Sequence, residues 1–519
     1  MKEMDKIISP LSKEPPSSYA ERLGLEYTSI VNQQHKKEFG QFFTPKQVAE
    51  FMANLSDIQE STITLLDPGF GVGILTCALV EKFILNHGKK ARVEIIAYET
   101  DFQIYPYANA SIQYLKNWVE SQDANLSYKI SSKNFITDNA NKTKYKKFFD
   151  IVISNPPYFK IPKDDESNLA ASSIFGVQNN IYSLFMGIST DLLKPNGELI
   201  FITPRSFSSG GYFKSFREFF FNKVQLERVH LFISRKDTFN RDKVLQETLI
   251  IKATKQQIKN KKVIISSSNG LSDLNKCENR EYPHDHLIDV VSNEKILYLP
   301  TNDQEDEVIN IFNKWHDNLN SLNIHISTGP VVAFRAYNSI VLNEIKKGNF
   351  CPLLWLHNVT KMQVSWPINR VNKGQYIEIN DFTKSSLIPN KNYVLLRRFS
   401  SKDDKSRLIA APYYSELDFP LLGVENKLNY IYRKGGKLSE FEVTGLAALL
   451  NSRHFDTYFR IFNGNVNVSA TELREIPFPP LETIIEIGKQ IIMGKDFTPE
   501  TIGTIVNRYF QIDYKLELL

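Results

Sequence analysis

Short apolar runs alternate with stretches of helical apolar spacing through the first half of the chain. This alternation is typical of an α/β protein, in which buried strands form a sheet that helices cover on both faces. We predict strands at residues 63–66, 93–98, 150–154, 198–203, 226–232 and 247–252. We predict helices at residues 18–37, 74–85, 105–120 and 181–193, and another that begins with a Thr44 cap and Pro45.

The pattern changes at residues 251–262, which carry five lysines, and in the polar stretch that follows. A chain of 519 residues also exceeds the roughly 250–300 residues at which one hydrophobic core stops growing. We therefore predict two domains: an α/β domain over residues 1–260, with a helical segment at its start, and a mixed α+β domain over residues 301–519. Residues 261–300 are expected to form a linker region.

Composition restricts the class of protein. A hydrophobic content of 42% is ordinary for a globular chain, and apolar runs such as residues 198–203 are too short to span a bilayer. Residues 1–16 lack the apolar core of a signal peptide. The three cysteines, Cys77, Cys277 and Cys351, form no CxxC pair. We therefore expect no disulfide framework, no metal site and a cytoplasmic location.

A glycine-rich turn follows the first predicted strand. Residues 65–73 read Leu-Leu-Asp-Pro-Gly-Phe-Gly-Val-Gly and lead directly into a predicted helix. Glycines in such a turn let the backbone approach a ligand at the helix N-terminus. At the end of the next strand, the Glu99 carboxylate is placed to accept hydrogen bonds from both ribose hydroxyls of a nucleoside cofactor. Dinucleotide enzymes use nearly the same geometry. The candidate cofactor-binding residues here are Asp67, Pro68, Gly69, Gly71, Gly73 and Glu99.

A second motif, Asn155-Pro156-Pro157-Tyr158, ends the apolar strand predicted at residues 150–154. The prolines fix the backbone and leave a carbonyl that no neighbouring amide need claim. The Asn155 side-chain oxygen and the Pro156 carbonyl can together accept both protons of a planar NH2 group. Such contacts draw the nitrogen toward tetrahedral geometry and free its lone pair, while Tyr158 provides a ring on which a base can stack. We therefore predict that this motif is catalytic.

These motifs together resemble those of amino-methyltransferases. Residues 40–45 (Gly-Gln-Phe-Phe-Thr-Pro), the 67–73 turn, Glu99 and the Asn-Pro-Pro-Tyr motif stand in the order of the gamma class of DNA adenine-N6 methyltransferases, which have a TaqI-like catalytic domain. The resemblance implies a Rossmann-like S-adenosylmethionine-dependent methyltransferase domain over about residues 23–254, followed by a target-recognition domain. It implies methylation of adenine N6 in double-stranded DNA with S-adenosylmethionine as the cofactor.

The resemblance also implies roles for single residues. Thr44 would help to hold the methionine part of the cofactor, Glu99 the ribose and the Asn134-Phe135 pair the cofactor's adenine, while Asn155 would border the cofactor. Asn134 stands where the family usually carries Asp, although an amide oxygen can also accept a hydrogen bond. Phe239 matches an aromatic residue that packs on the flipped base, and its alternative reading is a core residue beside a strand.

The C-terminal region carries a further resemblance. Residues 463–470 and 472–479 resemble the end of target-recognition segments in restriction–modification proteins, and residues 327–332 and 394–399 are similar to segments of type II modification methylases of the PstI/BsuBI kind. This resemblance makes CTGCAG a candidate recognition sequence and leaves open a cognate restriction endonuclease encoded nearby. We expect a monomer. Basic residues that are candidates for DNA contacts, about half of which are expected to be only solvated surface, are Lys361, Arg370, Arg397, Arg398, Lys402, Lys405, Arg433 and Lys434.

Methylation inside a duplex requires the base to leave the stack, at a cost of about a few kcal/mol. No Pro-Cys pair occurs, so the sequence does not indicate the covalent chemistry of cytosine-C5 methylases. Two alternatives stay open. The same Asn-Pro-Pro-Tyr motif occurs in enzymes that methylate RNA or a protein glutamine, and a non-catalytic DNA-specificity or defence subunit can retain a methylase fold.

Overall fold

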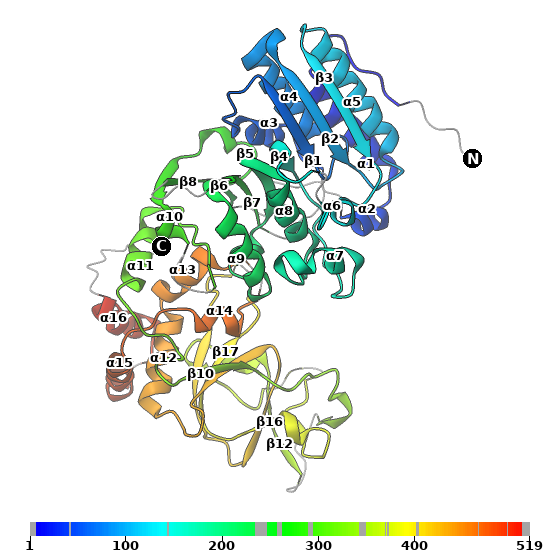
Figure 1. The fold of residues 1–519 in the computed structure, drawn as a ribbon. Helices are drawn as coiled ribbons and strands as arrows, with labels where there is room; N and C mark the ends of the chain where they lie inside the picture. Colours follow the sequence, from blue (N-terminus) through cyan, green and yellow to red (C-terminus); the bar gives the residue numbers. More distant parts are fainter. Residues whose placement is uncertain are drawn as a thin grey trace. The chain divides into compact units, whose positions relative to one another are not determined.

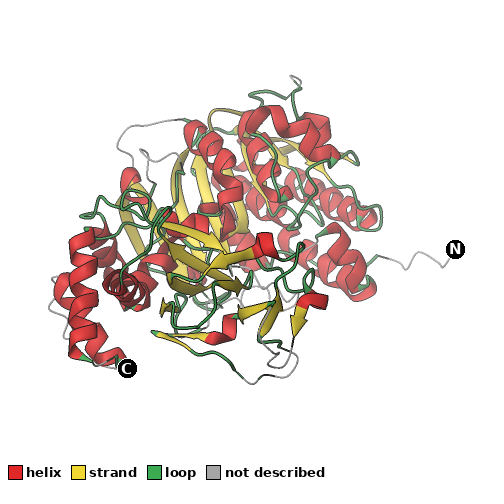
Figure 2. Cartoon of the chain, turned by 90° about the horizontal axis from the view of Figure 1, so that it is seen from below, coloured by secondary structure: helices red, strands yellow, loops and turns green. Residues whose placement is uncertain are grey.

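The computed structural model describes residues 7–40, 43–142, 145–233, 247–256, 262–288, 294–341, 349–368, 370, 373–400, 404–464, 467–495 and 497–510. The chain folds into two compact units, residues 1–301 and residues 302–519 (Figure 1). Each unit contains both helices and strands (Figure 2). No described helix is long and apolar enough to cross a membrane.

The first unit is built on a nine-stranded sheet with the order β3-β2-β1-β4-β5-β7-β6-β8-β9. The strands β1 to β5 are parallel to one another, whereas β7 runs antiparallel to both β5 and β6. The chain order reverses between β1 and β4, and ligands of open α/β sheets bind at such a switch point. The strands are β1 (Thr62–Asp67), β2 (Arg92–Tyr98), β3 (Asn125–Ser131), β4 (Phe149–Ser154), β5 (Leu193–Pro204), β6 (Gln225–Phe232), β7 (Thr248–Thr254), β8 (Lys262–Ser268) and β9 (Asn279–Pro283).

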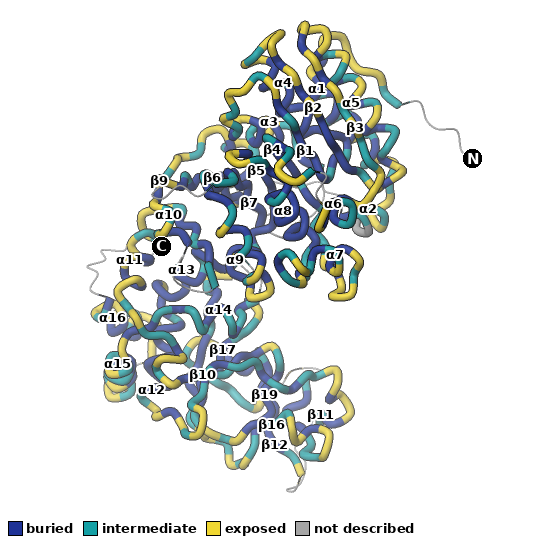
Figure 3. Tube along the Cα trace, in the orientation of Figure 1, coloured by how far each residue is buried: buried dark blue, intermediate teal, exposed yellow. Residues whose placement is uncertain are grey.

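Alternate residues of the central strands pack into two separate cores. Ile151 and Ile153 of β4 face α3, α4 and α5, whereas Val152 faces α6, α8 and α9. Both faces of the sheet are therefore covered, and its central strands are buried (Figure 3). This confirms the predicted α/β class. The helices of this unit are α1 (Pro16–Ile30), α2 (Gln33–Phe39), α3 (Lys46–Asn54), α4 (Ile74–His87), α5 (Tyr105–Glu120), α6 (Phe135–Asn139), α7 (Glu166–Phe175), α8 (Ile181–Leu192), α9 (Lys214–Lys223) and α10 (His284–Leu287).

Several sequence-based expectations for this unit were wrong. The helix expected at residues 18–37 is two helices, because Val31 takes an extended conformation after α1. The linker expected at residues 261–300 contains β8 and β9, which extend the sheet beyond β6. A fragment ending near residue 260 would therefore lose two strands. The edge strand β3 was missed because few of its side chains are buried, so it carries no apolar run.

The second unit mixes α and β elements, as predicted. A four-stranded sheet has the order β10-β20-β17-β18, a five-stranded sheet the order β11-β15-β12-β19-β16, and β13 pairs with β14. The strands are β10 (His325–Thr328), β11 (Ile340–Val341), β12 (Phe350–Leu354), β13 (Val359–Thr360), β14 (Gln363–Val364), β15 (Tyr376–Glu378), β16 (Leu387–Pro389), β17 (Asn392–Arg397), β18 (Ala410–Tyr414), β19 (Leu421–Val424) and β20 (Leu428–Tyr432).

The helices of the second unit follow mainly at its C-terminal end. Two of them, α12 and α15, cross closely at glycines: a Cβ on Gly445 would lie 1.9 Å from the Ile484 carbonyl oxygen, and one on Gly488 1.9 Å from that of Phe441. Any larger residue at either position would push the helices apart. The helices are α11 (Asp303–Phe312), α12 (Glu440–Asn451), α13 (Arg453–Phe462), α14 (Ala470–Arg474), α15 (Leu481–Gly494) and α16 (Pro499–Phe510).

Candidate active site

A cavity of about 330 Å³ lies in the first unit where β1, β2 and β4 end. Because parallel strands end at one edge of a sheet, residues far apart in the sequence meet there. Most of the residues that the sequence nominates line this cavity. They are Thr44, Pro68, Gly69, Gly71, Glu99, Asn134, Phe135 and Asn155.

The glycine turn borders the cavity between β1 and α4. Gly71 and Gly73 have φ angles of +54° and +76°, which side chains disfavour, and a Cβ on Gly73 would lie 2.2 Å from the Phe70 ring. The turn is pinned to the next strand, because the Phe70 amide donates to the Tyr98 carbonyl at 2.9 Å. The sequence therefore needs glycine at these two positions for conformational reasons as well as for ligand approach.

Asp67 lies behind the turn rather than in the cavity wall. Its side chain is buried and accepts hydrogen bonds from the Thr76 hydroxyl at 2.8 Å and the Gly69 amide at 3.3 Å. Burial raises the pKa of Asp67 to about 7, although both hydrogen bonds oppose the rise. Asp67 thus fixes the shape of the turn, and Gly73 forms the N-terminal cap of α4.

Glu99 stands at the end of β2 and faces the cavity. Its two carboxylate oxygens accept hydrogen bonds from the amides of Gly71 and Asp101, each at 2.8 Å. Because a carboxylate has about four acceptor positions, it can still accept further hydrogen bonds. Burial raises the pKa of Glu99, although the hydrogen bonds from these amides lower it. The backbone thus holds a desolvated carboxylate toward the cavity.

Sequence reasoning missed Asp101, whose backbone amide donates to Glu99. The Asp101 carboxylate is buried, and one of its oxygens accepts hydrogen bonds from Tyr27 of α1 at 2.5 Å and pairs with His35 of α2 at 2.8 Å. The His35 ring also contacts that of Phe39, which lines the cavity. Asp101 therefore ties two N-terminal helices to the Glu99 loop. The acidic residue two positions after Glu99 was its only sequence signal.

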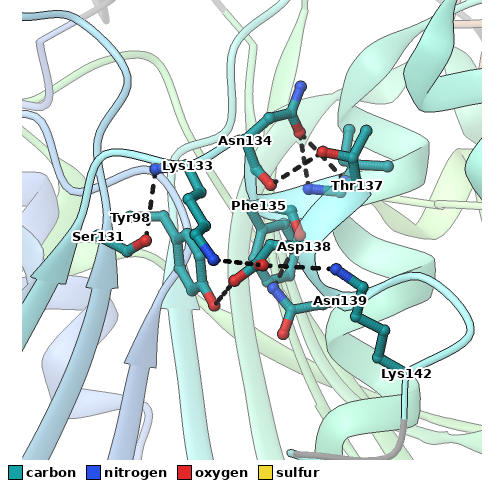
Figure 4. Close-up of polar contacts among 10 residues, drawn as sticks. Tyr98, Ser131, Lys133, Asn134, Phe135, Thr137, Asp138, Asn139 and Lys142 are labelled. Atoms are coloured by element: carbon teal, nitrogen blue, oxygen red, sulfur yellow. Dashed lines mark hydrogen bonds and ion pairs between the residues drawn. The ribbon is translucent and has the colours of Figure 1, made fainter.

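Asn134 and Phe135 form another wall of the cavity (Figure 4). The Asn134 side-chain oxygen caps α6 by accepting hydrogen bonds from the amides of Ile136 and Thr137, at 2.8 and 3.4 Å. The buried Phe135 ring contacts the rings of Tyr98 and Phe185, with centroids 5.3 and 5.2 Å away. The Asn134 oxygen, which was expected to contact an adenine, thus already caps α6. The apolar surface of Phe135 is the more available feature of this wall.

At the other side of the cavity, side chains hold Asn155. Its amide nitrogen donates to the buried Thr44 hydroxyl at 3.0 Å, and its oxygen accepts from the Tyr158 hydroxyl at 2.5 Å. The Tyr158 hydroxyl also lies 3.0 Å from the Ile202 carbonyl. Thr44 was expected to cap α3, but Pro45 occupies that position, which leaves the Thr44 side chain for Asn155.

The Asn-Pro-Pro-Tyr loop contains a second candidate acceptor, the Pro156 carbonyl. No described residue donates a hydrogen bond to the Pro156 carbonyl. The loop packs closely on Gly40, where a Cβ would lie 2.7 Å from the Phe159 ring and 3.0 Å from Pro157, and whose φ angle is +60°. Gly40 therefore lets the N-terminal segment approach the motif. Phe239 lies outside the described residues.

The described lining of the cavity contains neither cysteine nor histidine. Among the described residues, no cluster of His, Cys, Asp and Glu forms that could hold a metal ion. Cys77 and Cys351 are buried and outside the cavity, and burial raises the pKa of each thiol. The described cavity therefore offers polar positioning groups and apolar surfaces, which suit the binding and transfer of a preactivated group.

Comparison with known proteins identifies the family. The family model "Eco57I restriction-modification methylase" matches residues 63–239. The chain is 32% identical to the type II methyltransferase M.PstI of Providencia stuartii, over 93% of this chain and 95% of that protein. It is 33% identical to M.BsuBI of Bacillus subtilis, over 93% and 94% of the two chains. The chain belongs to the type II restriction–modification methyltransferases.

The methyltransferase is thus a site-specific DNA methyltransferase, as predicted from its motifs. The methyltransferase family implies S-adenosylmethionine as the methyl donor. The fold also resembles that of the type IIL restriction–modification enzyme MmeI in its complex with DNA. That match has a TM-score of 0.54 and 11% identity, and covers 96% of this chain and 74% of the other.

The basic residues nominated in the second unit of this methyltransferase have different surroundings. Arg397 donates to the Val359 carbonyl at 2.7 Å, and Arg398 to that of Asn426 at 3.1 Å, so both guanidinium groups are partly fixed. Arg433 instead pairs at 2.8 Å with Glu442, whose carboxylate caps α12. Lys402 lies outside the described residues. Arg433 is therefore neutralised by a structural partner.

Proposed function

We propose that this methyltransferase transfers a methyl group from S-adenosylmethionine to adenine N6 in double-stranded DNA. The observation that supports the proposal is the Asn155 amide in the cavity wall, followed directly in the chain by Pro156, whose carbonyl accepts no hydrogen bond from a described residue. Two acceptors beside each other suit a planar amino group, which has two protons to donate.

The other side of the cavity fits the methyl donor. Glu99 offers further acceptor positions for a ribose diol, and Phe135 with Phe185 offers an apolar slot for an adenine ring. Gly69 and Gly71 leave backbone open to the cavity, and Thr44 lines the same cavity, which supports its assignment to the methionine part. When bound, S-adenosylmethionine supplies a methyl group that its sulfonium already activates, so the protein needs mainly to position the acceptor nitrogen.

Asn155 and Pro156 would act on the acceptor nitrogen. The Thr44 hydroxyl holds the nitrogen atom of the Asn155 amide and the Tyr158 hydroxyl its oxygen, which would keep one further acceptor position for the substrate amino group. That oxygen would accept a hydrogen bond from one N–H of the amino group, and the Pro156 carbonyl would accept one from the other. The nitrogen lone pair is then withdrawn from the ring and directed at the methyl group. Because the methyl group is preactivated, no covalent enzyme intermediate is needed.

The proposal requires the adenine to leave the duplex. Unstacking costs about a few kcal/mol, and stacking on an aromatic ring returns about 1–3 kcal/mol. Tyr158 is suited to this role because its hydroxyl is anchored between Asn155 and Ile202 while its ring remains partly exposed. Phe239 is a second candidate for the opposite face of the base.

The second unit would then read the DNA sequence, with residues 302–519 as a target-recognition domain. CTGCAG is the first candidate sequence. A monomer that methylates its site would protect host DNA against a cognate restriction endonuclease encoded nearby. The similarity to M.PstI and M.BsuBI over most of the chain supports this setting, because both are type II methyltransferases.

Incubation of the purified enzyme with isotopically labelled S-adenosylmethionine and unmethylated DNA tests the reaction. After digestion to nucleosides, mass spectrometry should find the label in N6-methyladenine. Label in N4-methylcytosine would keep the amino-group mechanism and overturn the choice of base. Label in RNA or protein, with none in DNA, would favour the rival substrates that share the motif.

A further inference from the structure

His357 lies in the second unit, directly after β12, with its imidazole half-buried. Basic side chains from separate parts of the sequence surround it. Burial lowers the pKa of His357, and the charges of Arg370, Arg397, Lys373 and Lys427 lower it further. Contacts of the segments that carry these residues place them on the same part of this unit, and the Lys373 amide donates to the Arg370 carbonyl.

Backbone contacts bring these segments together. Arg397 ends β17 opposite Leu428, which begins β20, so Lys427 lies beside that end of the strand. Arg397 also donates to the Val359 carbonyl, two residues after His357. The Lys373 ammonium lies 4.2 Å from the ring centroid of Trp355, two residues before His357. The cluster is therefore a fixed feature of the fold and not a chance collection of long side chains.

Few acidic groups balance this cluster. Lys427 lies 3.8 Å from the buried Glu425 carboxylate, whose pKa is raised by burial. Within the described parts of the chain, no carboxylate forms an ion pair with Arg370, Lys373 or Arg397. Elsewhere in this unit, Arg433 and Arg460 have close acidic partners. Asp404 also acts on Arg397 and Glu425 on Lys373, so carboxylates offset part of the charge, and the surroundings of His357 keep an excess of positive charge.

Exposed aromatic surface lies next to the cluster. Val331 pairs with Glu425 in an isolated bridge, and its carbonyl accepts from the Asn426 amide. Three residues further on, the Phe334 side chain is 78% exposed, and the guanidinium group of Arg335 lies over its ring. An exposed ring near a group of cations is a combination that nucleic acids can cover, through their bases and phosphates.

We propose that Arg370, Lys373, Arg397 and Lys427 around His357 form the phosphate-binding surface by which the second unit holds duplex DNA. This inference rests on the proposed function for its DNA substrate. The cations come from three separate segments, so they suit an extended polyanion with regularly spaced charges better than a single phosphate group. Phe334 and Arg335 then extend the same surface toward the DNA.

Two matched pairs of lysine substitutions test the surface in the full-length enzyme. Lys373→Gln/Lys427→Gln removes two charges of the cluster. The control, Lys391→Gln/Lys437→Gln, removes two exposed charges near Gly436, where the Lys391 ammonium donates to the Gly436 carbonyl. Lys391 precedes the first residue of β17 and Arg397 is its last, so at about 3.3 Å per residue the control site lies about 20 Å along the strand.

Fluorescence anisotropy with a labelled duplex of mixed sequence, over a salt titration, gives the readout. The cluster variant should bind at least about tenfold more weakly, and its slope of log affinity against log salt should fall by about two. The control should match the wild type, and both variants should bind S-adenosylmethionine normally, which verifies folding. The proposed phosphate-binding surface would be refuted if both variants had equal DNA affinity and equal salt dependence, or if the wild type did not bind DNA.

This outcome is independent of which base is modified. If the cluster variant loses DNA binding while the wild type methylates cytosine N4, the surface stands and the adenine proposal fails. If the wild type produces N6-methyladenine and the cluster variant binds DNA as well as the control does, the adenine proposal stands and the surface fails.

Discussion

The two sides of the cavity hold their polar groups in different ways. Glu99 is held by backbone amides of Gly71 and Asp101, whereas Asn155 is held by the side chains of Thr44 and Tyr158. Backbone donors are set by the fold and survive most substitutions, but side-chain hydrogen-bond partners can be removed singly. The comparison teaches that cofactor binding and methyl transfer should be separable by mutation, with affinity lost at one side and turnover at the other.

The largest effect is expected at Asn155. Asn155→Ala removes an acceptor that our account uses only as the amino nitrogen becomes nucleophilic, so turnover should fall by about a hundredfold or more, roughly 3 kcal/mol. Affinity for S-adenosylmethionine should remain nearly unchanged. Asn155→Asp should be milder, because a carboxylate oxygen still accepts. Steady-state turnover and calorimetry on the same preparations give both numbers, and near-normal turnover of the alanine variant would refute the role.

Glu99 should show the opposite pattern. Glu99→Ala removes hydrogen bonds to a ribose that are charge-assisted, so affinity for S-adenosylmethionine should weaken by about 1.5–3 kcal/mol. At saturating cofactor, turnover should recover much of its wild-type value. Calorimetry on the free enzyme measures the first effect. An unchanged dissociation constant would mean that Glu99 only supports the turn through the Gly71 amide.

A smaller loss is expected at Tyr158, which touches both the base and Asn155 in our account. Tyr158→Phe keeps the ring but deletes the hydroxyl that lies 2.5 Å from the Asn155 oxygen, so turnover should fall by a factor equivalent to about 1 kcal/mol. Tyr158→Ala also loses the stacking surface and should weaken binding of DNA with an extruded adenine. Equal activities for the two variants would exclude a stacking role for the ring.

Asp67 should affect catalysis least and stability most clearly. Its pKa is raised to about 7 by burial, so the folded state binds a proton that the unfolded state releases. Stability from this group should fall as pH rises from about 4 to about 7 and then level off. The side chain of the Asp67→Asn variant cannot titrate. Between about pH 5.5 and about pH 8, the unfolding temperature should therefore fall less in the variant than in the wild type. Identical pH dependence in both proteins would place the titrating group elsewhere.

The central parallel strands were predictable because their signals are local. The strands β1, β2 and β4 are apolar runs, and their common direction brings Glu99 and Asn155 to one edge. The other end of the sheet was not predictable in this way. In β8, Ser266 and Ser268 are buried because their hydroxyls pair with the two ring nitrogens of His230 at 2.9 and 3.0 Å. A hydropathy pattern shows that a residue is polar, but it does not show that a residue distant in the sequence forms a hydrogen bond with it.

The same limit explains what was missed at the site. Asp101 gains its importance from Tyr27 and His35, which are more than sixty residues away in the sequence. The basic surface around His357 likewise joins separate segments that carry no common motif. Motifs reveal the chemistry where contiguous residues perform it, whereas supporting contacts and binding surfaces depend on the three-dimensional fold.

Sequencing of modified bases in cellular DNA tests the central claim most directly. Cells that express the wild-type enzyme should carry N6-methyladenine at one defined sequence, with CTGCAG as the first candidate, and cells that express Asn155→Ala at equal level should lack it. N4-methylcytosine in place of methyladenine, methyladenine without a sequence context, or an undiminished signal from the Asn155→Ala variant would contradict the account.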